Sequence, residues 1–115
     1  MGSLCNKLIR HSLYSEFNIS FPINLNYRED LYVILSLLIK VDNITIRHLN
    51  CGYYHYTCDL NVNSLVKTSN IDVHKLCIAK FSELLNNTIY HDIFISDFTL
   101  VMCLKLLRNE VLTSK

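Results

Sequence analysis

The chain contains 115 residues, of which half are hydrophobic and 18% are charged, and its formal net charge is +1. This length is enough for one domain with a hydrophobic core and short for two. The eleven Lys and Arg residues are spread along the chain without a cluster, which argues against binding to a nucleic-acid backbone. We therefore predict a single domain over residues 1–115, with the short N-terminal segment 1–25 at its periphery.

Two helices are expected in the first part of the chain. Three apolar side chains recur at intervals of four residues: Ile9, Leu13 and Phe17. This spacing predicts a helix from about residue 6 to 17, which the proline-containing segment 18–25 breaks. Asn26, followed three residues later by Glu29, has the spacing of a capping box, and a nearly continuous apolar run comes after it. We expect a buried central helix over residues 28–40.

From residue 43 the hydrophobic period changes from that of a helix to two, the period of a β-strand. Alternating apolar residues predict a strand over 43–49 and a second over 54–62, joined by a three-residue loop at 50–52. Residues 65–68 form a short third strand in this interpretation. The sequence therefore predicts a small antiparallel sheet over residues 43–68.

A helix is expected next, over residues 71–85, with Ser69 or Asn70 as its N-terminal cap. Its apolar positions have helical spacing: Val73, Leu76, Cys77, Phe81 and Leu84. This pattern predicts the face that the helix turns toward the core.

Residues 93–95 are interpreted as a short strand or extended segment, and Ser96 as the cap of a last helix over 97–108. That helix is apolar nearly all round, so it must be buried, either in its own domain or against a partner. The fold class that follows is α+β: a three-stranded antiparallel sheet packed against three to four helices.

The order His-x2-Cys occurs three times in the chain: His48 and Cys51, His55 and Cys58, His74 and Cys77. In a regular strand His55 and Cys58 point to opposite faces, so the middle pair cannot share an ion. The outer two pairs could form a four-ligand metal shell.

Residues 48–52 resemble a zinc knuckle, with Gly52 after the second ligand, although a histidine stands where the knuckle usually begins with cysteine. The order of knuckle, hairpin and helix start is similar to a treble-clef site. The resemblance implies a structural zinc ion held by four side chains: His48, Cys51, His74 and Cys77. The alternative needs no metal: residues 50–52 are a hairpin loop, Cys77 is a small core side chain and His74 is exposed.

The first residues resemble an N-myristoylation signal, in which Gly2 carries the acyl chain and Cys5 is a palmitoylation site, although Asn6 departs from the preferred Ser or Thr. This implies peripheral contact with a membrane surface. The alternative is that Gly2 is merely small and Cys5 incidental. Five cysteines form an odd set with no secretory leader before them, which predicts an intracellular, cytoplasmic location.

No catalytic motif is apparent, and we expect no enzyme; the histidines His11 and His91 are interpreted as surface residues. The outer face of the predicted sheet carries polar and aromatic residues suited to recognition of another protein: Arg47, Tyr53, His55, Thr57 and Asp59. The function we expect is that of a non-enzymatic intracellular interaction or regulatory protein, such as a small viral accessory factor. A structural-zinc module is the first alternative. The second follows from a resemblance of the order helix, three strands, helix to double-stranded-RNA-binding domains.

Overall fold

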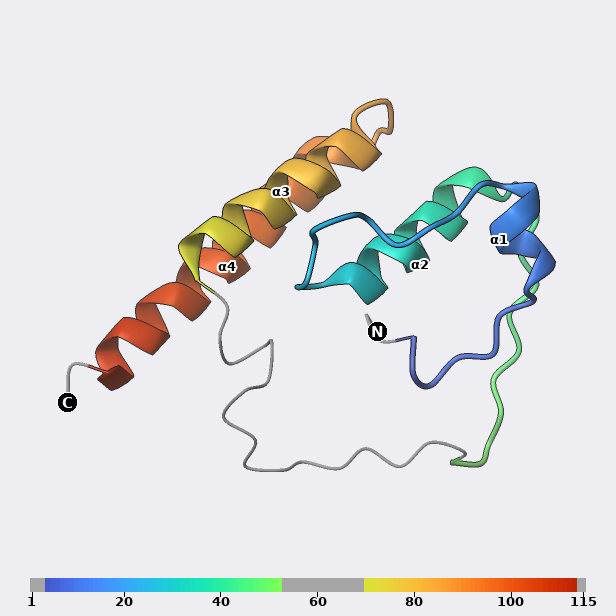
Figure 1. Cartoon of the computed structure of the whole chain (residues 1–115), viewed down its shortest axis with the longest axis horizontal. Coiled ribbons are helices and arrows are strands. Elements are labelled where there is room, and N and C mark those ends of the chain that lie inside the picture. Colours follow the sequence, from blue (N-terminus) through green and yellow to red (C-terminus); the bar gives the residue numbers. More distant parts are fainter. Residues whose placement is uncertain (1–3, 53–69, 114–115) are drawn as a thin grey trace. The chain divides into compact units, whose positions relative to one another are not determined.

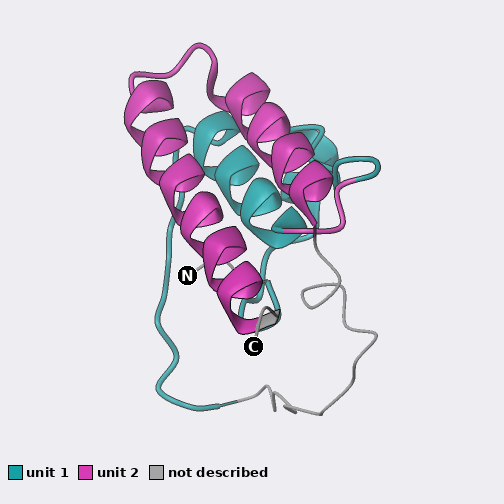
Figure 2. Ribbon diagram, turned by 90° about the vertical axis from the view of Figure 1, so that its left-hand side faces the viewer, with its two compact units in different colours: residues 1–24, 28–62 teal, residues 25–27, 63–115 magenta. Residues whose placement is uncertain are grey.

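The computed structural model describes residues 4–52 and 70–113, which contain four α-helices (Figure 1). Their bounds are α1 Ser12–Glu16, α2 Glu29–Lys40, α3 Ile71–Leu85 and α4 His91–Thr113. The chain divides into two compact units (Figure 2). Unit 1 consists of Met1–Asn24 and Arg28–Val62, and unit 2 of Leu25–Tyr27 and Asn63–Lys115. We describe each unit by itself, and the single-domain prediction stays a prediction.

The predicted α+β fold is wrong, because residues 4–52 and 70–113 contain no β-strand and are all-α. The first predicted strand, 43–49, lies within the described part and is irregular, with Ile44 and Ile46 both exposed. The predicted strands 54–62 and 65–68 lie outside the described residues. A period of two is a local pattern, whereas a strand also needs a hydrogen-bonded partner, and residues 43–49 form no such pairing within the described part of the chain.

Unit 1 is built around one face of α2. Its buried cluster consists of Ile19, Val33, Leu37 and Val41, and partly buried residues from the N-terminal segment pack against it: Leu4, Ile9, Leu13, Tyr14 and Phe17. The backbone N–H of Leu4 donates to Asp30 Oδ2 of α2 at 3.0 Å. The predicted first helix is therefore too long, since α1 covers five residues while the segment before it reaches the cluster without being helical.

The central helix α2 agrees closely with the predicted range, but its start differs. Arg28 occupies the N-cap in the left-handed conformation, with φ 60°, and its side chain makes no capping hydrogen bond to the start of the helix. The capping box expected at Asn26 is therefore wrong. Glu29 and Asp30 lie in the first turn, where negative side chains interact favourably with the positive end of the helix dipole. The buried hydroxyl of Ser36 donates to the Tyr32 carbonyl at 2.8 Å, so it is satisfied within the helix.

In unit 2, α3 begins and ends where the sequence predicts. Asn70 is extended, and its side-chain oxygen accepts hydrogen bonds from the amides of Asp72 and Val73, each at 3.1 Å. These two hydrogen bonds satisfy backbone N–H groups that have no acceptor within the helix, because they lie in its first turn. A short turn follows Leu85, and α4 packs against α3.

The last helix is longer than predicted, because α4 already begins at His91 and includes residues 93–95 and Ser96. The interpretation of 93–95 as a strand and of Ser96 as a cap is therefore wrong. Phe94 and Phe98 lie four residues apart on α4, with ring centroids 5.4 Å apart. Phe94 stacks against Phe81 of α3, and the Phe98 ring contacts Phe81 at a tilt. Phe94 joins this three-ring cluster only as part of a helix. The contacts in the cluster therefore outweigh the strand propensity of the isoleucines on either side of Phe94.

Candidate functional site

The first predicted zinc-binding pair, His48 and Cys51, lies in the irregular segment of unit 1. Both residues are exposed. His48 Nδ1 is 3.0 Å from Asn50 Oδ1, so the imidazole is engaged with its own loop.

The second pair belongs to the core of unit 2. His74 is buried, which corrects its placement at the surface in the metal-free alternative. Its Nδ1 atom is 2.8 Å from Met102 Sδ, and its ring meets the Tyr27 ring edge-on, with centroids 4.9 Å apart. The Cys77 thiol is fully buried and donates to the Tyr27 carbonyl at 3.6 Å. Both side chains therefore already have partners in the core.

The predicted zinc shell is divided between the two units, with two ligands in each. Within residues 4–52 and 70–113, no group of three or more His, Cys, Asp or Glu side chains is placed to hold a metal ion. Cys77 could bind a zinc ion only as a thiolate, which would lose the hydrogen bond that its thiol donates to the Tyr27 carbonyl. The structural-zinc alternative stays a prediction.

Two other predicted sites lie largely outside the described residues. Gly2 is outside them, while Cys5 is exposed. Of the predicted recognition surface, Arg47 is exposed and the other four residues are outside: Tyr53, His55, Thr57 and Asp59.

The element order on which the resemblance to RNA-binding domains depended is not found in the described part of the chain. No helix in that part is long and apolar enough to cross a membrane.

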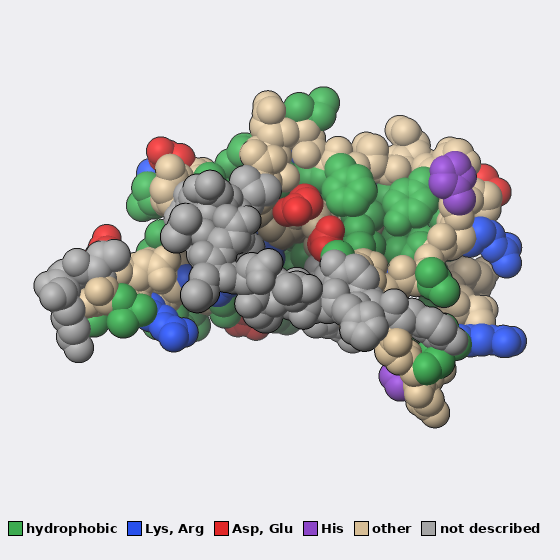
Figure 3. All heavy atoms as spheres, turned by 60° about the horizontal axis from the view of Figure 1, so that its bottom comes forward, with side chains coloured by type: hydrophobic (Ala, Val, Ile, Leu, Met, Phe, Trp, Pro, Cys, Tyr) green, Lys and Arg blue, Asp and Glu red, His purple; other side chains and the backbone are tan. Residues whose placement is uncertain are grey.

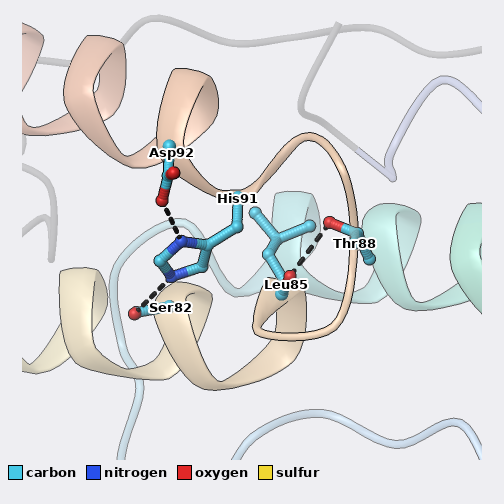
Figure 4. A network of polar contacts seen from close by, with 5 residues as sticks. All are labelled: Ser82, Leu85, Thr88, His91 and Asp92. Atoms are coloured by element: carbon cyan, nitrogen blue, oxygen red, sulfur yellow. Dashed lines mark hydrogen bonds and ion pairs between the residues drawn. The ribbon is translucent and has the colours of Figure 1, made fainter.

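A polar network that the sequence did not predict joins α3 to the start of α4 (Figure 4). Ser82 Oγ is 2.9 Å from His91 Nε2, and His91 Nδ1 is 2.8 Å from Asp92 Oδ1. Because an ionised carboxylate only accepts hydrogen bonds, Nδ1 carries a proton; a neutral imidazole then accepts from the Ser82 hydroxyl at Nε2. In the same turn Thr88 Oγ1 donates to the Leu85 carbonyl at 2.9 Å.

The atoms of Ser82, His91 and Asp92 meet in the order found in serine hydrolases, but two features favour a structural role. The Asp92 side chain is 99% exposed, so water competes for the carboxylate that would orient the imidazole. Ser82 lies in the interior of α3, where backbone amides are used by the helix and cannot bind an oxyanion. The network therefore fastens the α3–α4 turn, and His91 is half-buried rather than a plain surface residue.

The outer face of α4 is apolar and exposed. Five side chains that are 57–70% exposed define this face, which we call the α4 stripe: Ile93, Leu100, Leu104, Leu107 and Val111. The buried Met102 lies on the opposite side of the helix. The expectation that an all-apolar helix is buried is therefore met on one side only. Hydrophobic side chains also gather on the face drawn in Figure 3, beside charged ones.

No protein-family model, curated protein or solved structure gives a significant match to this chain.

Proposed function

We propose that the chain is a non-enzymatic interaction protein that works by protein–protein contact, with the α4 stripe as its contact surface. The observation that carries the proposal is the exposure of five large apolar side chains along one face of one helix. The opposite face of α4 packs against α3 through the phenylalanine cluster, so α3 holds in place the helix that carries the α4 stripe. Contiguous exposed apolar surface of this kind marks interaction sites in proteins.

The free energy gained by covering the α4 stripe indicates that its partner is apolar as well. Burying a leucine-sized side chain completely is worth roughly 1.5–3 kcal/mol, so covering the exposed part of the α4 stripe contributes roughly 5–9 kcal/mol. Association costs about 4–15 kcal/mol in lost freedom of motion. The contribution of the α4 stripe is therefore of the same order as this cost, and a stable complex needs apolar surface from the partner as well.

The proposal is tested by affinity purification of the tagged chain from cells that also produce an untagged copy. The matched variants are Leu104→Glu, within the α4 stripe, and Ile89→Glu, at an apolar residue of the α3–α4 turn that is 84% exposed. We expect at least one protein, the untagged copy included, to be retained by the wild type and by Ile89→Glu and lost with Leu104→Glu. If no protein depends on Leu104 in this way, the proposal is wrong.

A further inference from the structure

We propose that the partner of the α4 stripe is a second copy of the same chain, and that the two α4 helices pack antiparallel about a two-fold axis near residue 102. This inference rests on the proposed function, because it names the partner of that surface. Three observations carry it: the spacing of the α4 stripe, the position of Asp97 within that spacing, and the area of the α4 stripe.

The spacing of the α4 stripe is that of a helix–helix seam. The apolar residues and Asp97 follow one another at intervals of four and three residues: Ile93, Asp97, Leu100, Leu104, Leu107 and Val111. Alternation of four and three is the repeat by which two α-helices interlock their side chains. An apolar partner of any other shape would not require this repeat, whereas a second α4 supplies it.

Asp97 decides the direction in which the second helix runs. In a parallel pair each seam residue faces its own copy, so two Asp97 carboxylates would meet with like charge in the centre of an apolar seam. In an antiparallel pair about residue 102, Asp97 is level with Leu107 of the other copy and next to Arg108, which is exposed in the single chain. The guanidinium can then pair with the carboxylate.

The same arrangement pairs four of the five apolar residues of the α4 stripe with one another, while Leu107 faces Asp97. Ile93 faces Val111 of the other copy, and Leu100 faces Leu104, so the interface is self-complementary about its axis. Two exposed residues flank the axis, Val101 on one side and Cys103 on the other, and each approaches its own copy.

The area agrees with a small, reversible dimer. At about 100 Å² per leucine-sized side chain, the exposed part of the α4 stripe is on the order of 300 Å² per copy. A standard interface buries about 800 Å² per partner, of which about 56–65% is apolar. The α4 stripe thus supplies more than half of the apolar area of such an interface, and we expect a dissociation constant on the order of micromolar.

The experiment is sedimentation velocity of the full chain in reducing buffer over a wide concentration range. We expect a monomer–dimer equilibrium in the wild type. Leu104→Glu should raise the dissociation constant at least about tenfold, because it places a carboxylate in the seam, while Ile89→Glu should leave it unchanged. Circular dichroism of each variant confirms that the helices remain formed. A dimer that Leu104→Glu does not weaken overturns the inference.

Charge exchange tests the direction of the helices. Asp97→Arg and Arg108→Asp should each weaken the dimer, because each brings like charges together between the two copies. The double variant Asp97→Arg, Arg108→Asp should restore the wild-type dissociation constant to within about threefold. A parallel pair cannot show this rescue, so failure of the double variant to recover overturns the antiparallel arrangement.

A protein that stays monomeric overturns the dimer, and the rate of alkylation of Leu104→Cys then separates the two proposals. Rapid alkylation would mean that the α4 stripe is open and that the proposed function stands with a different partner. Alkylation as slow as that of the buried Cys77 would mean that the α4 stripe is covered by its own chain, which overturns the proposed function as well.

Discussion

Truncation of Phe81 is the most direct test of what holds α3 and α4 together. Phe81 is fully buried, and its ring centroid lies 5.8 Å from that of Phe94 and 4.9 Å from that of Phe98. Phe81→Ala removes the transfer free energy of the ring and leaves a cavity, which together cost about 3–5 kcal/mol in buried sites. Two aromatic contacts are lost as well, so we expect the free energy of unfolding to fall by about 4 kcal/mol.

The measurement is urea unfolding followed by circular dichroism at 222 nm, with all variants at one protein concentration so that association contributes equally. The expected loss corresponds to a fall in melting temperature of about 15 °C or more for a chain of this size. The control is Ile71→Ala, since Ile71 is 53% exposed at the start of the same helix and should change stability by less than about 0.5 kcal/mol. A loss below about 1 kcal/mol for Phe81→Ala, or an equal loss for both variants, would refute the assignment of Phe81 to the core of this unit.

Three further predictions concern unit 2. Asn70→Ala should lower the free energy of unfolding by about 1 kcal/mol in urea unfolding, because two amides lose their acceptor, whereas Asn70→Asp should retain most of it; equal effects would exclude a capping role. In a double-mutant cycle, Ser82→Ala and His91→Ala should show a coupling of about 1 kcal/mol, and strict additivity would argue against their hydrogen bond. At submicromolar concentration of folded protein, alkylation read by peptide mass spectrometry should modify Cys103 rapidly and Cys77 only on unfolding; comparable rates would contradict the burial of Cys77.

The helices that the sequence predicted well are those whose signals are local. For α3, the cap at Asn70 and the polar residues after Leu85 act within one helical turn, and both ends were placed correctly. The range of α2 was predicted from its apolar run, which is likewise a local signal. The burial on α3 was only partly predicted. Cys77 and Phe81 are buried as expected, but His74 and Leu85 are buried instead of Val73, Leu76 and Leu84, and Leu76 is 37% exposed.

The features that sequence reasoning missed depend on partners far along the chain. The metal-free alternative placed His74 at the surface, yet it contacts Met102 and Tyr27, and neither is near it in sequence. The start of α4 was missed because it depends on Phe94 contacting Phe81 of another helix. The hydrogen bond of His91 to Ser82 likewise becomes visible only once the α3–α4 turn is known. The alternating pattern at 43–49 is local, and it does not by itself supply the hydrogen-bonded neighbour that a strand needs.

The short segment Leu25–Tyr27, which belongs to unit 2 although its neighbours on both sides belong to unit 1, affects how the protein acquires its structure. The Tyr27 carbonyl accepts from Cys77, 50 residues away, and its hydroxyl accepts from Lys105, 78 residues away, at 2.8 Å. During synthesis Tyr27 therefore emerges long before the helices that enclose it. The α3–α4 hairpin can form from neighbouring contacts, but its core is completed only when a large loop closes. The entropic cost of this step grows only slowly with loop length, but the step slows folding. A fragment that starts at residue 63 would lack this tyrosine, so unit 2 cannot be obtained intact by cutting the chain once.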